Sequence, residues 1–240
     1  MSDSPSGARA AVLLDIDGTL VDSTYHHGLA WFRAFHEVVG ADRTPALWRL
    51  HRTIGMGGDK LVTEVAGEEV EDKHGDALRE AWEKKYAEVE SEVPALPGAA
   101  AMIEHLVGAG YVVALASSGK KHFSENAVST LGVGEHVSIL TTSEDAEESK
   151  PESDLLHATL DKLHDLDGFA IDRAVMVGDT PYDVESAAKA GLRCLTVRTG
   201  GFGVDELTEA GAAQVLDDLS GYADVDWEGL MRPLEGNKGA

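Results

Sequence analysis

The feature that most constrains the fold is a series of short apolar runs, each continuous rather than alternating with polar residues. Such runs are typical of strands that are buried on both faces of a parallel sheet. Segments with helical spacing separate the runs, and this strand–helix alternation predicts right-handed crossovers. We therefore expect a Rossmann-like, doubly wound α/β core. The predicted strands are AVLL (11–14), YVVALA (111–116), VSIL (137–140), AVMV (174–177) and RCLTV (193–197).

The stretch from residue 23 to residue 93 departs from this rhythm. It holds long helical patterns, among them TYHHGLAWFRAFHEVVG and ALREAWEKKYAEVE, and no convincing strand. The turn-forming sequence VPALPG (93–98) then marks the return to the sheet. We expect an inserted all-helical domain at 23–93, an α/β core at 11–22 and 94–240, and a flexible N-terminal tail at 1–10.

Charge and cysteine content limit the partners and the compartment. The formal net charge of −23 argues against nucleic acid or an anionic membrane as a partner. The single cysteine, Cys194, cannot form an internal disulfide, which is consistent with a reducing compartment. The first residues lack the basic and apolar regions of a secretory signal, and no apolar run approaches the roughly 20 residues of a membrane span. We expect a cytoplasmic protein.

Acidic and hydroxyl side chains follow the ends of the predicted strands. In open α/β sheets, ligands bind outside the carboxyl ends of the strands, so these side chains are expected to converge. Neighbouring carboxylates repel each other unless a cation or a shared proton lies between them. The candidate residues, in chain order, are Asp15 and Asp17, then Ser117, Ser118 and Gly119, then Lys150, and finally Asp179 and Asp183.

Taken singly, these residues have simpler explanations. Asp15 and Asp17 could open a calcium loop, but Leu20 and His26 occupy the positions where such a loop needs glycine and glutamate.

The other candidates have structural alternatives as well. Ser117 and Ser118 could form a helix N-cap, and Asp183 could cap the helix predicted in DVESAAKAG. Lys150 could be a surface lysine. Their joint occurrence at successive strand ends favours a shared site.

The ordered motifs Asp-x-Asp-Gly-Thr, Ser, Lys-Pro and Gly-Asp-x-x-x-Asp resemble those of the haloacid dehalogenase superfamily. The resemblance covers nearly the whole chain, and the helical insert looks like the cap of the subgroup containing phosphoglycolate phosphatases and β-phosphoglucomutases. It implies a Mg²⁺-dependent phosphatase, a hydrolase that acts on a small phosphorylated metabolite through an aspartyl-phosphate intermediate.

The resemblance also implies a role for each motif residue. Asp15 would attack phosphorus, Asp17 would act as general acid and base, and Lys150 would offset developing negative charge. Ser117 would hold the phosphoryl group. The implied Mg²⁺ ligands are Asp15, the backbone carbonyl of Asp17, Asp179 and Asp183, and the further phosphate-binding residues are Thr19, Ser118 and Gly119.

Two residues of the insert are candidates for substrate binding. Arg52 lies in the glycine-rich stretch HRTIGMGGDK (51–60) and could hold an anionic or hydroxylated leaving group, although it could equally be a surface arginine. His27 lies early in the first helix of the insert, where related enzymes often place a histidine. A core or surface histidine is an equal alternative.

Three other functions compete with a phosphatase. A phosphomutase would share every core residue and differ only in the cap contacts. A 2-haloacid dehalogenase would lack Asp17 and Asp179, so their presence argues against it. A non-catalytic phosphate-binding protein would be expected to have lost a catalytic group.

A monomer or a homodimer is expected, and the sequence leaves the substrate open.

Overall fold

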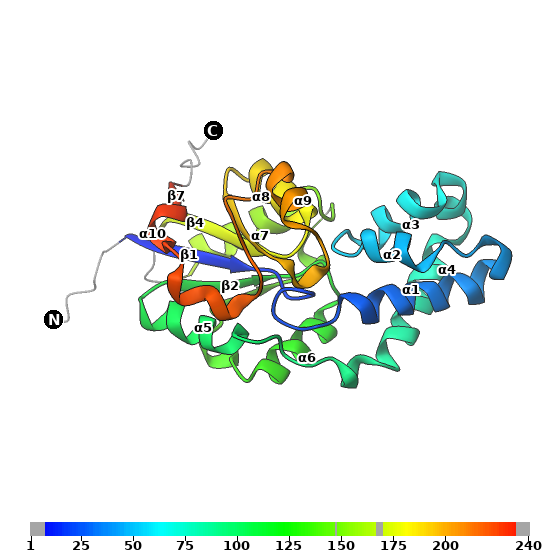
Figure 1. The fold of residues 1–240 in the computed structure, drawn as a ribbon, viewed down its shortest axis with the longest axis horizontal. Helices are drawn as coiled ribbons and strands as arrows, with labels where there is room; N and C mark the ends of the chain where they lie inside the picture. The colour runs from blue at the N-terminus through cyan, green and yellow to red at the C-terminus, as the bar shows by residue number, and fades with distance from the viewer. Residues whose placement is uncertain (1–7, 147, 167–169, 234–240) are drawn as a thin grey trace. The chain divides into compact units, whose positions relative to one another are not determined.

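The computed structural model describes residues 8–146, 148–166 and 170–233. Within these ranges, seven strands form one sheet (Figure 1). The parallel strands follow the order β3-β2-β1-β4-β5-β6, and β7 pairs antiparallel with β4. The strands are β1 (Ala8–Leu14), β2 (Val112–Ala116), β3 (Ile139–Thr141), β4 (Ala170–Gly178), β5 (Arg193–Val197), β6 (Gln214–Leu216) and β7 (Arg232–Pro233). The predicted α/β fold class with inserted helices is confirmed.

The strand order reverses between β1 and β4. From β1 the chain adds β2 and β3 on one side, and then β4, β5 and β6 on the other. Ligands of open α/β sheets bind at such a switch point, outside the carboxyl ends of the strands. The pairing of Leu14 with Val177 brings the loops that carry Asp15 and Asp179 together at this point.

Helices cover both faces of the sheet, α7, α8 and α9 on one side and α5 and α6 on the other (Figure 1). The leucines of α7 pack with Leu13 and Met176 in one buried cluster. A fully buried leucine contributes about 1.5–3 kcal/mol, so this stripe fixes α7 against the sheet. The helices are α5 (Ala99–Gly108), α6 (Lys121–Leu131), α7 (Asp154–His164), α8 (Pro181–Lys189), α9 (Val204–Ala210) and α10 (Trp227–Leu230).

Residues Asp22–Pro94 form a second compact unit with its own core. Trp31 and Phe35 are buried there, and Trp31 stacks on Trp82 with 5.4 Å between the ring centroids. That this unit is a separate cap domain stays a prediction. Its helices are α1 (Thr24–Val39), α2 (Leu47–Arg52), α3 (Gly58–Ala66) and α4 (Glu68–Ala87).

The prediction of a flexible tail over residues 1–10 is wrong for residues 8–10, and residues 1–7 lie outside the described ranges. Strand β1 begins at Ala8 because Arg9 and Ala10 find partners in Ile171 and Arg173 of β4. Other expected strands are displaced: the third begins at Ile139 instead of 137, and the fourth is longer at both ends. Five further elements were not predicted from the sequence: β6, β7, α6, α9 and α10.

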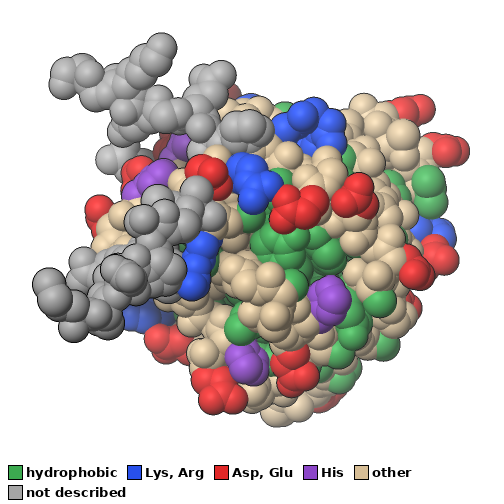
Figure 2. Space-filling view, turned by 90° about the vertical axis from the view of Figure 1, so that its left-hand side faces the viewer, with side chains coloured by type: hydrophobic (Ala, Val, Ile, Leu, Met, Phe, Trp, Pro, Cys, Tyr) green, Lys and Arg blue, Asp and Glu red, His purple; other side chains and the backbone are tan. Residues whose placement is uncertain are grey.

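Charged side chains of both signs share the molecular surface. Figure 2 shows one face of the molecule, on which acidic and basic side chains are interspersed around an apolar area. Within the described ranges, no helix has the combination of length and apolar character needed to cross a bilayer.

Candidate active site

A buried lysine links two of the predicted acids. The Nζ atom of Lys150 lies 2.5 Å from Oδ1 of Asp15 and 2.7 Å from Oδ1 of Asp183. Lys150 is only 1% exposed. A charge this deeply buried needs paired opposite charges, and the two carboxylates supply them. The lysine is therefore part of the site and not a surface residue.

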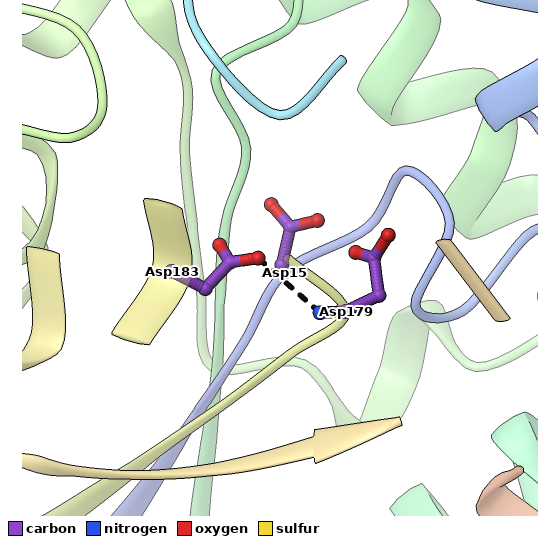
Figure 3. Close-up of side chains that lie close together, drawn as sticks. All are labelled: Asp15, Asp179 and Asp183. Carbon is purple, nitrogen blue, oxygen red and sulfur yellow. Dashed lines mark hydrogen bonds between the residues drawn. The ribbon is translucent and has the colours of Figure 1, made fainter. Parts of the chain in front are cut away.

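Asp179 lies beside this pair at the end of β4. Its Oδ1 atom accepts a hydrogen bond from the hydroxyl of Thr19 at 2.8 Å, and both side chains are buried. Figure 3 shows the carboxylate of Asp15 between those of Asp183 and Asp179, with the oxygens of all three pointing to the same side. The aspartates that follow β1 and β4 thus present one shared group of oxygens.

Asp183 is held by its position in the first turn of α8. Its Oδ2 atom accepts hydrogen bonds from the hydroxyl of Thr180 at 2.7 Å and from the backbone N–H groups of Thr180 and Asp179 at 3.0 and 3.2 Å. Thr180 in turn accepts a hydrogen bond from the backbone N–H of Asp183. This reciprocal capping box, with Pro181 next in the chain, starts the helix. Asp183 therefore both caps α8 and orients Lys150.

The second motif lies next to Asp17. The hydroxyl of Ser117 is 3.5 Å from Oδ2 of Asp17, and it accepts a hydrogen bond from the backbone N–H of Gly119 at 3.0 Å. The Oγ atom of Ser118 is buried and has no hydrogen-bond partner among the described residues. A buried hydroxyl left in this way has unused capacity to bind a ligand oxygen.

Burial and mutual repulsion raise the pKa values of Asp15 and Asp179. Burial raises the pKa of Asp15 to about 7, against the opposing effect of Lys150, and the charges of Asp183 and Asp17 add to the rise. Burial and the charges of Asp183 and Asp15 raise the pKa of Asp179 well above its ordinary value. For Lys150, burial lowers the pKa but the two facing carboxylates outweigh it, so the pKa rises and the ammonium form persists.

Comparison with known proteins identifies the family. A family model described as haloacid dehalogenase-like hydrolase matches residues 12–197, which is most of the chain. The chain belongs to this family. The resemblance drawn from the motifs is thereby confirmed, as is the expectation of an enzyme of the hydrolase class.

Curated relatives and solved structures agree with the assignment. The chain is 27% identical over 233 residues to a phosphoglycolate phosphatase of Rhodospirillum rubrum, covering 93% of this chain and 92% of the relative. It is 29% identical over 199 residues to a phosphoglycolate phosphatase of Yersinia pseudotuberculosis, covering 80% and 82% of the two chains. A crystal structure of a hydrolase from Pseudomonas syringae is 28% identical, with a TM-score of 0.81, and the match covers 90% of this chain and 97% of that one.

The acidic group fits a divalent cation. Asp15, Asp179 and Asp183 each offer one oxygen, and these oxygens lie within 4.8 Å of one another. The Oδ2 atom of Asp179 is buried and accepts no hydrogen bond from the described part of the chain. Carboxylate oxygens are the ligands that hard divalent ions prefer. A cation would therefore meet an orphaned oxygen and relieve the repulsion in this haloacid dehalogenase-like site.

The two candidates from the insert lie in the helical unit. His27 of α1 is buried and stacks on Tyr86 with 3.9 Å between the ring centroids, and on Trp82 at 5.6 Å. Arg52 ends α2 and is half-buried. The stack gives His27 a packing role in that unit. The contact of either residue with a substrate stays a prediction.

The loop after β5 makes contacts at the site that were not predicted from the sequence. The hydroxyl of Thr199 donates a hydrogen bond to the carbonyl of Gly18, and Gly200 lies against the carboxylate of Asp179. The only sequence signal was a glycine pair following a predicted strand. Such a pair is common in turns and does not by itself indicate a site.

Proposed function

We propose that the protein is a Mg²⁺-dependent phosphatase that hydrolyses small phosphate monoesters through an aspartyl-phosphate on Asp15. The observation that carries the proposal is the buried lysine, which holds Asp15 by one oxygen at 2.5 Å and is itself held by Asp183. A carboxylate oriented by a fixed cation is a competent nucleophile, and the same cation offsets charge that develops on the phosphoryl group.

The reaction divides between Asp15 and Asp17. In the first step an oxygen of Asp15 forms a bond to phosphorus, the bond to the leaving oxygen breaks, and Asp17 gives that oxygen a proton. In the second step Asp17 takes a proton from a water molecule whose oxygen attacks phosphorus, and the bond to Asp15 breaks. Asp17 is suited to both steps because it lies beside Asp15 in the chain and its carboxylate is only partly exposed.

The other residues bind and orient. Ser117, Ser118, Gly119 and Thr19 are proposed to surround the phosphoryl oxygens. The buried Ser118 hydroxyl, which has no hydrogen-bond partner within the described ranges, supports this most directly. Thr19 already donates its hydroxyl to Asp179 and its backbone N–H to the carbonyl of Ile16 at 3.3 Å, so it would act on the phosphoryl group mainly by holding Asp179.

The proposed cation site uses the Asp15 carboxylate, the Asp17 backbone carbonyl and Asp179, with Asp183 close by. Mg²⁺ would neutralise the clustered acids and polarise the phosphoryl group when bound. Both Asp183 oxygens already accept hydrogen bonds from Lys150, Thr180 and nearby backbone, so Asp183 would act on the cation mainly through this network.

The substrate class is a small phosphorylated metabolite. The support is that relatives at 27% and 29% identity are named phosphoglycolate phosphatase. Arg52 and His27 are proposed to contact the leaving group. We retain the cytoplasm as the proposed location, supported by the free, buried Cys194, and a monomer or homodimer as the proposed assembly.

A metabolite screen tests the proposal. Purified protein should release phosphate from several phosphate monoesters with Mg²⁺ and lose that activity in excess chelator. Asp15→Asn should abolish release, whereas the matched surface change Asp161→Asn on α7 should leave it unaltered.

Two results would contradict the proposal. Equal release in chelator would remove the cation from the mechanism, and active Asp15→Asn protein would reassign the nucleophile. Conversion of β-glucose 1-phosphate into an isomer, without release of phosphate, would establish the phosphomutase alternative.

A further inference from the structure

The loop after β5, residues 198–202, joins the two loops that carry the site's aspartates. The hydroxyl of Thr199 donates a hydrogen bond to the carbonyl oxygen of Gly18, the residue directly after Asp17. Phe202 meets the ring of Tyr182 edge-on, with 6.4 Å between the centroids, and Tyr182 lies in the first turn of α8, which directly follows the loop that carries Asp179. We call residues 198–202 the β5 loop.

Gly200 of the β5 loop leaves room for the carboxylate of Asp179. A Cβ atom at Gly200 would lie 1.9 Å from Oδ2 of Asp179 and 2.9 Å from its backbone oxygen. The φ angle of Gly200 is outside the left-handed region, so the backbone itself would accept alanine. The requirement for glycine is therefore one of space next to this carboxylate.

The opposite side of the carboxylate is held by Thr19. Its hydroxyl donates to Oδ1 of Asp179 at 2.8 Å, and Thr19 is fully buried. Asp179 is thus fixed by a hydrogen bond at Oδ1 and by close packing at Oδ2. Oδ2 itself is buried and accepts no hydrogen bond from the chain as described. Such an arrangement defines the direction of the oxygens without using up their capacity for a ligand.

We propose that Thr199 and Gly200 are positioning residues that, together with Thr19, orient the Asp179 carboxylate for a divalent cation. The inference rests on the proposed function, because it requires a cation at this site. Mg²⁺ demands near-ideal octahedral geometry, so a small rotation of one ligand weakens binding. Groups that orient a metal ligand typically change metal affinity by about 10–100-fold when they are mutated.

The direct test is Gly200→Ala, measured as the dissociation constant for Mg²⁺ by calorimetry on chelator-treated protein. We expect affinity to fall by about tenfold or more, since the new methyl group must displace the carboxylate. The matched control is Gly203→Ala in the same region, where a Cβ would lie 3.4 Å from its nearest neighbour, Glu206 Oε2. That variant should bind Mg²⁺ like the wild type.

A second pair of variants guards against a folding defect in Gly200→Ala. Thr199→Val removes the donor to Gly18 with little change in volume, and Thr199→Ser restores it. We expect weaker Mg²⁺ binding in Thr199→Val and recovery in Thr199→Ser. Circular dichroism in chelator reports whether each metal-free variant is folded.

The outcomes separate the two proposals. If the wild type binds Mg²⁺ and folded Gly200→Ala binds it equally well, the positioning inference is overturned, even if the melting temperature of the variant falls. If Gly200→Ala does not fold, equal affinities in the wild type, Thr199→Val and Thr199→Ser overturn it. If the wild type itself fails to bind Mg²⁺, the proposed function fails, and the inference fails with it.

Discussion

Replacing Lys150 with methionine would leave two buried carboxylates without their shared counter-charge. Methionine keeps most of the length and apolar surface of the side chain, so the main loss is the ammonium that lies 2.5 Å from Asp15 and 2.7 Å from Asp183. Removing one partner of a buried ion pair costs about 3–5 kcal/mol. At about 2–4 °C per kcal/mol for a chain of this size, the melting temperature should fall by about 6–20 °C.

The effect of Lys150→Met should depend on pH in a defined direction. The pKa of Asp15 is about 7 even beside the lysine, so near pH 5 this carboxyl holds a proton and needs no counter-charge. Near pH 8 it is charged, and the variant must either bury that charge alone or bind a proton. The difference in melting temperature between wild type and variant should therefore be larger at pH 8 than at pH 5.

The assay is thermal unfolding of chelator-treated protein followed by circular dichroism at both pH values. Lys162→Met is the matched control, because Lys162 pairs with Asp145 at a similar distance, 2.7 Å, but is 40% exposed. Exposed pairs contribute about 0–1 kcal/mol, so this variant should melt close to the wild type. Equal melting temperatures for Lys150→Met and wild type at pH 8 would refute the reasoning. If the melting temperature of Lys150→Met is lower than that of the wild type by the same amount at both pH values, the loss comes from packing and not from charge.

Three further predictions follow from the site. Asp17→Asn should slow hydrolysis of the aspartyl-phosphate by about 10²–10⁴-fold, measured by stopped-flow turnover, and an unchanged rate would exclude its acid–base role. Burial raises the pKa of Asp15 from 3.8 to about 7, so the stability of the metal-free protein should fall as pH rises through that range. Mg²⁺ affinity should rise about tenfold or more per pH unit below 7, because Asp15 must lose its proton and the pKa of Asp179 is raised as well. Calorimetry that finds pH-independent affinity would contradict this. Thr180→Ala should cost about 1 kcal/mol in chemical denaturation through the lost cap of α8, and an unchanged midpoint would mean that the capping box contributes nothing.

The convergence of the motif residues could be predicted from the sequence because it depends on topology. Parallel strands end at the same edge of a sheet, so residues that follow them meet whatever the details of packing. Asp15, Lys150, Asp179 and Asp183 were predicted together and lie together. The pairing of Lys150 with Asp183 was not predicted, since it depends on how the first turn of α8 directs that side chain.

The β5 loop and several elements had no comparable signal. Gly200 matters because one carboxylate passes close to it, and this proximity is a property of the packed structure that no local pattern encodes. Strand β6 is three residues long, and α6 presents few apolar residues, so their periodicity was too weak to distinguish them from loops. The start of β1 was missed because Arg9 interrupts the apolar run.

The central claim is that Asp15 becomes phosphorylated during turnover. The most direct measurement uses Asp17→Asn protein and an aryl phosphate, because an aryl leaving group needs little help from the acid Asp17 and the intermediate should then form and persist. The protein is mixed with Mg²⁺ and a phosphate monoester that the wild type hydrolyses, quenched in acid and mapped by peptide mass spectrometry. We predict one added phosphoryl group on the peptide that contains Asp15 and none in the Asp15→Asn variant. A phosphoryl group on a different residue, or an unmodified peptide while phosphate is still released, would contradict the account.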